Sequence, residues 1–193
     1  MLTTRGSLLG RIRDTNDADA WAAFVDIYGP LVYRYGRRKG LQDSDAADLS
    51  QAVLTEVARC IDRFSYDPSL GRFRNWLMVI ARHQLSSLAD KHVRHAGSGD
   101  SRVAVELHQL PADDDLEERF ESEYREHLFR WAADKVRDEV EESTWLAFWR
   151  TSVEGAPPQK VADELEKKVG SIYVAKSRIV LRIRELIASV DDR

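Results

Sequence analysis

Apolar residues recur at helical spacing along almost all of this 193-residue chain, and this periodicity restricts the folds open to it. The stretch from Phe73 to Leu88 shows it most clearly, because its apolar residues project as one stripe on a helix. Alternating strand patterns are few, and Asn-Gly or Asp-Gly hairpin turns are absent. We therefore expect an all-α protein. The members of the stripe are Phe73, Leu77, Ile80, Ala81, Leu85 and Leu88.

Turn and cap residues divide the remaining chain into further helices. Asn16 or Asp17 can cap a first long helix, and Gly29-Pro30 is expected to break it. Ser44 or Asp45 can cap the next one. The expected helices are Leu31–Lys39, Asp45–Phe64, Leu116–Glu139, Glu142–Val153 and Pro158–Leu165, followed by a last helix from about Ser171 to Val190.

Charge is distributed unevenly, although the net charge of −4 is modest. Residues 1–97 carry 14 Lys and Arg against 11 Asp and Glu, a balance of +3. Residues 98–142 carry 6 against 15, a balance of −9, and residues 143–193 carry 9 against 7, a balance of +2. The acidic block lies between two mildly basic blocks, and we expect that in the free protein it competes with nucleic acid for their basic faces. The alternative is that the block only solubilises the linker.

Breaks in the acidic block suggest where the domains end. Gly97–Asp100 and Pro111–Asp115 are rich in Gly, Ser, Pro and Asp and cannot bury enough apolar surface to order themselves. We expect two small helical domains joined by a flexible acidic linker. Their expected limits are 1–95 for the first domain, 96–118 for the linker and 119–193 for the second domain.

Aromatic and basic residues gather before and within the striped helix. Phe64 and Tyr66 are flanked by Arg63, Arg72 and Arg74, and Arg82 follows on the outer face of the helix. Single-stranded nucleic acid is held by aromatic stacking beside cations that track its phosphates. The segment therefore meets the requirement for nucleic-acid binding, although amphipathic helices with arginines are common. The structural alternative is that the aromatics belong to the core and the arginines to a solvated face.

The order D-P-S-x-G-x-F-R-x-W-L-x-x-I-A-R over Asp67–Arg82 resembles conserved region 2 of the extracytoplasmic-function (ECF) sigma factors. These are the small members of the sigma-70 family, which direct bacterial RNA polymerase to promoters. The resemblance implies that the aromatic and basic segment captures unstacked bases of the −10 promoter element. It also implies a helical region 2 bundle in the first domain.

A second pattern, D-x-x-D-L-x-Q-x-x-L, precedes the first one. It resembles region 2.2 of the same family, the helix that docks on the β′ clamp of the polymerase. The matching residues are Asp45, Asp48, Leu49, Gln51 and Leu54. The alternative is that the polar members of this set form an ordinary solvated face.

The last part of the chain is read as a helix-turn-helix. Pro158–Leu165 is its first helix, Glu166–Gly170 the connection, and Ser171 the expected N-cap of the second helix. Exposed side chains near the start of that helix can enter a major groove. The alternative is an ordinary helical hairpin. Lys176-Ser177-Arg178 resembles part of the G-T-V-K-S-R-L signature of sigma region 4.2, and the candidate contacts are Ser171, Tyr173, Lys176, Ser177 and Arg178.

The resemblance implies a bacterial sigma factor that binds core RNA polymerase, recognises and melts promoter DNA, and initiates transcription. Its partners would be the polymerase β′ clamp and β flap, promoter DNA and an anti-sigma factor. Neither a cofactor nor catalytic chemistry is expected. The alternative is a helix-turn-helix transcription regulator that acts on duplex DNA without polymerase.

Other classes of protein receive less support from the sequence. His83, His92 and His95 could serve a helical metal-dependent hydrolase, but no cysteine or carboxylate completes a convincing ligand set, so no metal site is expected. The single cysteine, Cys60, excludes an internal disulfide and is expected to be an inert thiol. No secretory leader pattern and no apolar run of roughly 20 residues occurs, so a cytoplasmic protein without membrane contact is expected.

Overall fold

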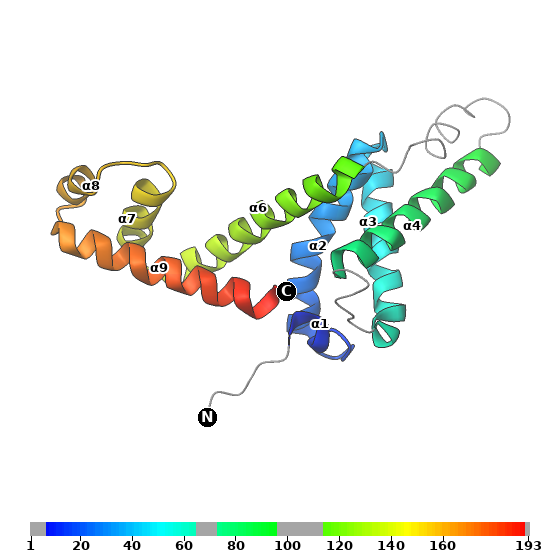
Figure 1. The fold of residues 1–193 in the computed structure, drawn as a ribbon, viewed down its shortest axis with the longest axis horizontal. Helices are drawn as coiled ribbons and strands as arrows, with labels where there is room; N and C mark the ends of the chain where they lie inside the picture. The colour runs from blue at the N-terminus through cyan, green and yellow to red at the C-terminus, as the bar shows by residue number, and fades with distance from the viewer. Residues whose placement is uncertain (1–6, 65–72, 96–113, 192–193) are drawn as a thin grey trace. The chain divides into compact units, whose positions relative to one another are not determined.

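The computed structural model describes residues 7–64, 73–95 and 114–191, and these residues are helical with short connections (Figure 1). No strand occurs among them, which confirms the expected all-α class. The chain divides into two compact units: the first reaches to Arg125 and the second is Glu126–Asp191. The tail residues 192–193 and the predicted contacts Tyr66 and Arg72 lie outside the described residues.

The first unit consists of a short N-terminal helix, three long helices and the beginning of a fourth long helix. Apolar faces of α2, α3 and α4 pack together, and the expected stripe of α4 is buried from Phe73 to Leu85. Its helices are α1 (Leu8–Arg11), α2 (Ala18–Arg38), α3 (Asp43–Cys60), the 3-10 turn η1 (Ile61–Arg63), α4 (Phe73–His95) and the start of α6 (Asp114–Glu139).

Helix α2 runs without interruption through Gly29-Pro30, so the expected break there is wrong. A proline inside a helix removes one backbone hydrogen bond, and tertiary packing must compensate for it. α3 provides that packing: the buried Ser50 hydroxyl donates a 3.0 Å hydrogen bond to the Gly29 carbonyl. A Cβ at Gly29 would lie 3.7 Å from the Ser50 oxygen, an ordinary van der Waals contact, so α3 packs directly against this part of α2.

Helix caps follow the prediction at α2 but not at α3. The Asp17 carboxylate accepts a hydrogen bond from the Ala20 backbone N–H at 3.0 Å, which confirms Asp17 as the cap. α3 begins earlier than expected, at Asp43, after an N-cap residue Gln42 that makes no side-chain cap bond. The prediction that Ser44 or Asp45 caps this helix is therefore wrong. The Asp43 carboxylate instead accepts a hydrogen bond from Tyr33, which ties the start of α3 to α2.

An aromatic cluster forms the centre of the first unit. Phe24, Tyr28 and Phe73 are at most 1% exposed and meet edge to face or tilted, with ring centroids 4.7 to 5.9 Å apart. Tyr124 of α6 stacks on Tyr28 at 5.7 Å. The early part of α6 therefore belongs to this core, because Phe120 and Tyr124 are both 2% exposed there.

The second unit contains the rest of α6 and three further helices, α7 (Glu142–Ser152), α8 (Pro158–Glu164) and α9 (Val169–Val190). Two apolar clusters hold it together. The first cluster consists of Ala132, Ala133, Val136, Trp145, Phe148, Ile179 and Ile183. The second consists of Ala147, Val161, Ala162 and Ile172.

The expected domain limits can be compared with the observed helices and compact units. α6 begins at Asp114, within the expected linker 96–118, and residues 96–113 lie outside the described residues. The boundary between the compact units falls between Arg125 and Glu126 along the chain, because the first turns of α6 pack within the first unit. The assignment of 1–95 and 119–193 to separate functions stays a prediction.

Candidate nucleic-acid and partner interfaces

The outer face of α3 carries the polar residues of the predicted polymerase contact. Asp48 and Gln51 are exposed and Asp45 is half-exposed, so these three can meet a partner. Leu49 is fully buried and Leu54 is half-buried. Because the two leucines are buried or half-buried, they pack against the rest of the unit. They anchor α3, and its polar side chains face solvent.

Two predicted DNA contacts, Arg63 and Phe64, follow α3, and only the first of them is exposed to solvent. Arg63 is exposed at the end of η1. Phe64 is half-buried, and its ring lies 5.4 Å from that of Phe73 and 4.7 Å from that of Trp76. The Arg13 guanidinium donates a 2.7 Å hydrogen bond to the Phe64 carbonyl. Phe64 thus has a packing role that sequence reasoning offered as the structural alternative.

Arg82 and Arg74 both lie on α4 but in different surroundings. Arg82 is exposed, and its positive charge acts on the buried Tyr35 side chain. Burial raises the pKa of Tyr35, and Arg82 opposes that rise because a cation stabilises the phenolate. Arg74, in contrast, has a side chain only 6% exposed.

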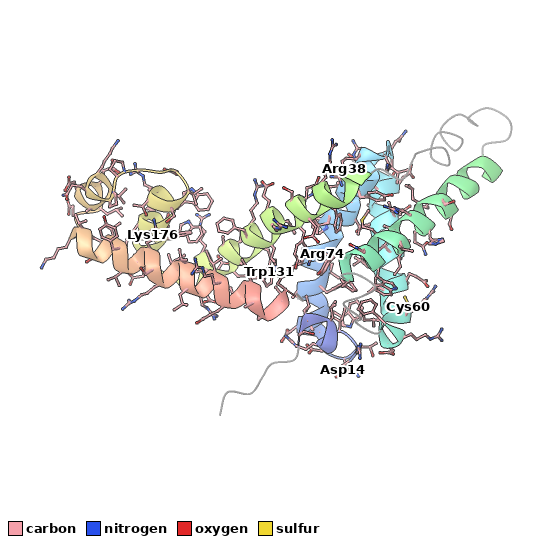
Figure 2. All side chains as sticks on the ribbon, viewed as in Figure 1. Asp14, Arg38, Cys60, Arg74, Trp131 and Lys176 are labelled. Atoms are coloured by element: carbon pink, nitrogen blue, oxygen red, sulfur yellow. The ribbon has the colours of Figure 1, made fainter. Side chains whose placement is uncertain are left out.

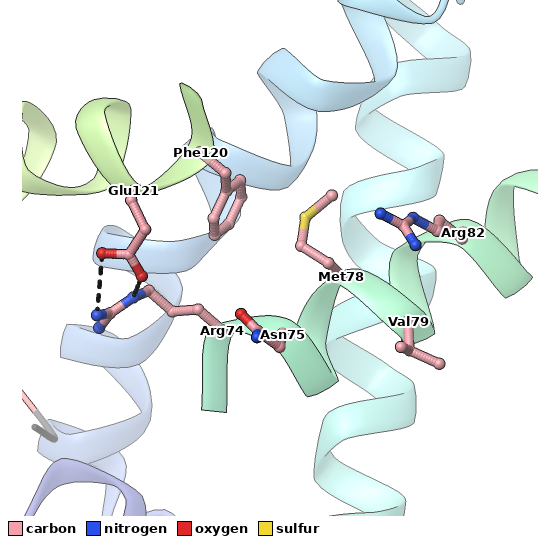
Figure 3. Close-up of a pocket in the computed structure, with 7 residues that line it drawn as sticks. All are labelled: Arg74, Asn75, Met78, Val79, Arg82, Phe120 and Glu121. Atoms are coloured by element: carbon pink, nitrogen blue, oxygen red, sulfur yellow. Dashed lines mark hydrogen bonds and ion pairs between the residues drawn. The ribbon is translucent and has the colours of Figure 1, made fainter. Parts of the chain in front are cut away.

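The Arg74 guanidinium is held by the beginning of α6. Its Nε and Nη2 atoms donate to the two carboxylate oxygens of Glu121 at 2.5 and 3.2 Å (Figure 3). It also lies over the Tyr124 ring, 4.2 Å from the centroid. Burial alone would lower the pKa of Arg74, but the hydrogen bond and charge of Glu121 outweigh it and raise that pKa. Arg74 is therefore a permanent cation, and in this conformation a carboxylate neutralises it.

A small cavity of about 140 Å³ adjoins this ion pair. Figure 3 shows α4 on one side of it and the start of α6 on the other. Its lining residues are Arg74, Asn75, Met78, Val79, Arg82, Phe120 and Glu121. The structure thus brings together two predicted DNA contacts, Arg74 and Arg82, with an aromatic ring and a carboxylate that sequence reasoning did not include.

The second unit contains a helix-turn-helix with a tight turn. The Lys167 N–H bonds to the Ala162 carbonyl at 2.9 Å and the Glu166 N–H to the Asp163 carbonyl at 3.3 Å. Glu166 has φ +53°, the left-handed conformation that this kind of helix end requires. α9 begins at Val169 after the N-cap Lys168, so the prediction that Ser171 is the N-cap is wrong. The turn at Glu166 ends α8 early enough for α9 to start sooner than the Gly170-Ser171 pair suggested.

The early part of α9 has one buried face and one exposed face. Ile172 and Ile179 are buried, whereas Tyr173 is 55% exposed. Ser171, Ser177 and Arg178 are exposed, and Lys176, labelled in Figure 2, is half-buried. The exposed group can reach a ligand directly.

A shallow hollow of about 480 Å³ lies beside this face of α9. It joins Ser171 and Arg178 to Lys167 and Lys168, two cations that sequence reasoning treated only as part of the connection. The Lys167 ammonium also donates to the Ser143 hydroxyl at 2.7 Å, at the start of α7. The adjacent lysines before the helix start were the sequence signal for this basic edge. The hollow is lined by Ser143, Thr144, Ala147, Lys167, Lys168, Gly170, Ser171, Val174, Ala175 and Arg178.

Other candidate groups stand apart from these surfaces. His83 is exposed, and the side chains of His92 and His95 lie outside the described residues. Across the part of the chain that is described, no three His, Cys, Asp or Glu side chains gather as a metal site would require. The Cys60 thiol donates to the Glu56 carbonyl at 2.8 Å, and burial raises its pKa. Among the described helices, none is both long and apolar enough to span a membrane.

Comparison with known proteins found one similarity, and it lies within the first unit. Residues 24–95 match the family model described as Sigma-70 region 2, and this range covers most of α2, all of α3 and all of α4. A comparison with curated proteins found no match. The matched range carries Asp48, Gln51 and Arg82 on the surface of α3 and α4, and Arg63 on the surface of η1. Residues 24–95 are therefore similar to sigma-70 region 2.

Proposed function

We propose that this protein is a sigma factor of the ECF type, which docks on core RNA polymerase and directs it to specific promoters. The observation that carries the proposal is the agreement between the region 2 match and the outer face of α3. Within the matched range, Asp48 and Gln51 project into solvent while Leu49 is fully buried. A polar helix face on a rigid apolar base suits docking on the β′ clamp.

The first unit would capture the −10 element. Arg63 and Arg82 are exposed cations near the half-buried Phe64, and this combination suits unstacked bases and phosphates. The full set proposed to meet DNA there is Arg63, Phe64, Tyr66, Arg72, Arg74 and Arg82. Strand separation would follow from capture of the unstacked bases, since the domain needs no catalytic group for it.

The second unit would read the −35 element as duplex. Arg178 is exposed on α9, and an arginine in the major groove can bridge the two acceptors of guanine. Tyr173, Lys176 and Ser177 flank it in the sequence, while Ser171, Lys167 and Lys168 would meet phosphates. The β flap of the polymerase and an anti-sigma factor are further proposed partners, and the cytoplasm is the proposed compartment, where bacterial polymerase acts.

Transcription with purified core polymerase on fragmented genomic DNA tests the proposal directly. We expect discrete start sites that appear only when the protein is added, preceded by shared −35 and −10 sequences. Omitting the protein, or replacing it with the Asp48→Arg, Gln51→Ala variant, provides the control. Start sites that do not depend on the protein would contradict the proposal.

The alternative function is a transcription regulator that binds duplex DNA without polymerase. It is favoured by one observation, the separate compact core of the helix-turn-helix unit. Measured affinity for core polymerase discriminates the two functions, because only a sigma factor requires it.

A further inference from the structure

The segment Arg119–Arg125 at the start of α6 covers basic side chains of the first unit. Glu121 holds Arg74 through two hydrogen bonds of 2.5 and 3.2 Å, as Figure 3 shows. Two residues later, Glu123 pairs with Arg38 and also lies 3.7 Å from the Arg34 Nε. Three arginines from two helices are therefore met by two carboxylates from one short segment.

Aromatic rings fasten the same segment to the unit. Phe120 and Tyr124 are each 2% exposed, and Tyr124 stacks on Tyr28 beneath the Arg74 guanidinium. Burial of these two aromatic side chains removes apolar surface from water and so stabilises the contact. Two buried rings and three ion pairs therefore hold the start of α6 against the first unit.

The fit of the segment is imperfect at one pair. Arg34 Nε and Glu123 Oε2 are too far apart for a hydrogen bond, and neither atom has another hydrogen-bond partner among the described residues. A buried polar atom without a partner costs free energy. That cost favours release when another anion can satisfy the arginine.

The carboxylates occupy the cations that a nucleic acid would use. Guanidinium groups bind phosphate and carboxylate in the same bidentate geometry, so the two ligands exclude each other at Arg74. Helix α4 carries exposed Arg82 beside the same cavity, so a DNA strand reaching Arg74 would pass over this side of the unit.

We propose that Arg119–Arg125 is an internal cover that competes with single-stranded DNA for the arginine face formed by Arg34, Arg38 and Arg74. The cover lowers the affinity of the free protein for single-stranded DNA, and its displacement exposes Arg74 and the Tyr124 contact surface of α2. This inference rests on the proposed role of the first unit in capturing promoter DNA.

The test uses the full-length protein and a labelled single-stranded DNA oligonucleotide at low salt. The variant Glu121→Gln, Glu123→Gln removes both carboxylates of the cover. Its control, Glu126→Gln, Asp134→Asn, changes the net charge equally on the exposed side of the same helix. We expect about tenfold tighter binding by the first variant, the size expected when one charge-assisted contact is released, and no comparable change in the control. Equal affinities of the two variants would overturn the proposal.

Two further measurements identify the cause of any gain in affinity for single-stranded DNA. Hydrogen exchange of the Arg119–Arg125 amides should be faster in the cover variant than in the control. Adding Arg74→Gln to the cover variant should abolish most of the gain in affinity. A faster exchange without tighter DNA binding would overturn the masking role. If the double variant folds poorly, Glu123→Gln alone leaves the Arg74 pair intact and should give a smaller gain in the same direction.

The outcome is separable from that of the proposed function. Polymerase-dependent transcription by the native protein, together with unchanged DNA binding by the cover variant, would refute the cover and leave the sigma role standing. A cover variant that binds single-stranded DNA more tightly, in a protein that supports no transcription, would refute the sigma role and retain the cover.

Discussion

Gly36 of α2 and Leu49 of α3 approach so closely that a Cβ on the glycine would lie 3.0 Å from the Leu49 Cδ2 atom. The same Cβ would lie 3.3 Å from Ala46 Cβ and 3.3 Å from Leu41 Cδ1. Because the Ala46 Cβ is fixed to the backbone of α3, it cannot move without shifting that helix. The contact between α2 and α3, and with it the position of Asp48 and Gln51, depends on the missing side chain at Gly36.

The first prediction is that Gly36→Ala destabilises the protein by about 1–2 kcal/mol, since overpacking in a tight core outweighs the better helix propensity of alanine. The free energy of unfolding in urea measures it. Gly170→Ala is the matched control, because nothing lies within 4 Å of a Cβ at that position of α9. We expect it to be neutral or stabilising by up to about 1 kcal/mol. Equal effects of the two substitutions would contradict the packing argument.

The second prediction concerns polymerase docking by α3. Replacing Asp48 by Arg together with Gln51→Ala should weaken binding to core polymerase at least tenfold, because both side chains are exposed and a reversed charge opposes a complementary surface. Titration against labelled core polymerase measures it. Asp134→Arg reverses the charge of an exposed aspartate in the second unit and should leave the affinity unchanged. Helical content should be unaltered in both variants. If the α3 variant binds core polymerase as tightly as the native protein, the proposed contact through Asp48 and Gln51 is wrong.

The third prediction concerns promoter reading by α9. Arg178→Ala should cost about 1–3 kcal/mol of holoenzyme binding and relax discrimination at one base position, as expected for a bidentate guanine contact. Binding to a set of −35 variants measures both effects. Arg184→Ala, an exposed arginine further along the helix, is the control. A uniform loss across all sequences would assign Arg178 to a phosphate instead.

The fourth prediction concerns acid stability in the second unit. The Arg182 guanidinium donates to both carboxylate oxygens of Glu139, at 2.7 and 3.0 Å, and this bond holds the pKa of Glu139 below its ordinary value of 4.5. A carboxylate with a depressed folded pKa stabilises the fold above its unfolded pKa and loses that effect as pH falls through the folded value. Glu139→Gln should therefore flatten the fall of the melting temperature below about pH 4.5.

Melting curves of the native protein, Glu139→Gln and the control Asp138→Asn, recorded at a series of pH values, measure the difference. The control removes a neighbouring exposed carboxylate. Parallel curves for native protein and Glu139→Gln would show that the pair with Arg182 contributes nothing to acid stability.

The sequence alone determined the helical class and the buried stripe of α4, and it limited the cap of α2 to Asn16 or Asp17. These features depend on local periodicity and on hydrogen bonds between near neighbours, which a linear sequence displays directly. The region 2 patterns around Asp48 and Arg82 were readable for the same reason, since each lies within a few helical turns. The sequence also predicted that the outer face of α3 is polar, because the large apolar residues of this helix fall on its other face.

Only the tertiary structure decided which local signals prevailed. Pro30 predicted a break, but packing of α3 on Gly29 keeps α2 continuous. Arg74 looked like a surface cation, and it is buried because Glu121, distant in sequence, reaches it from α6. The physical reason is the same in both cases. A local preference is worth from a fraction of a kcal/mol to about 3 kcal/mol, and contacts between distant segments contribute more free energy than that. No single stretch of sequence contains both partners of such a contact.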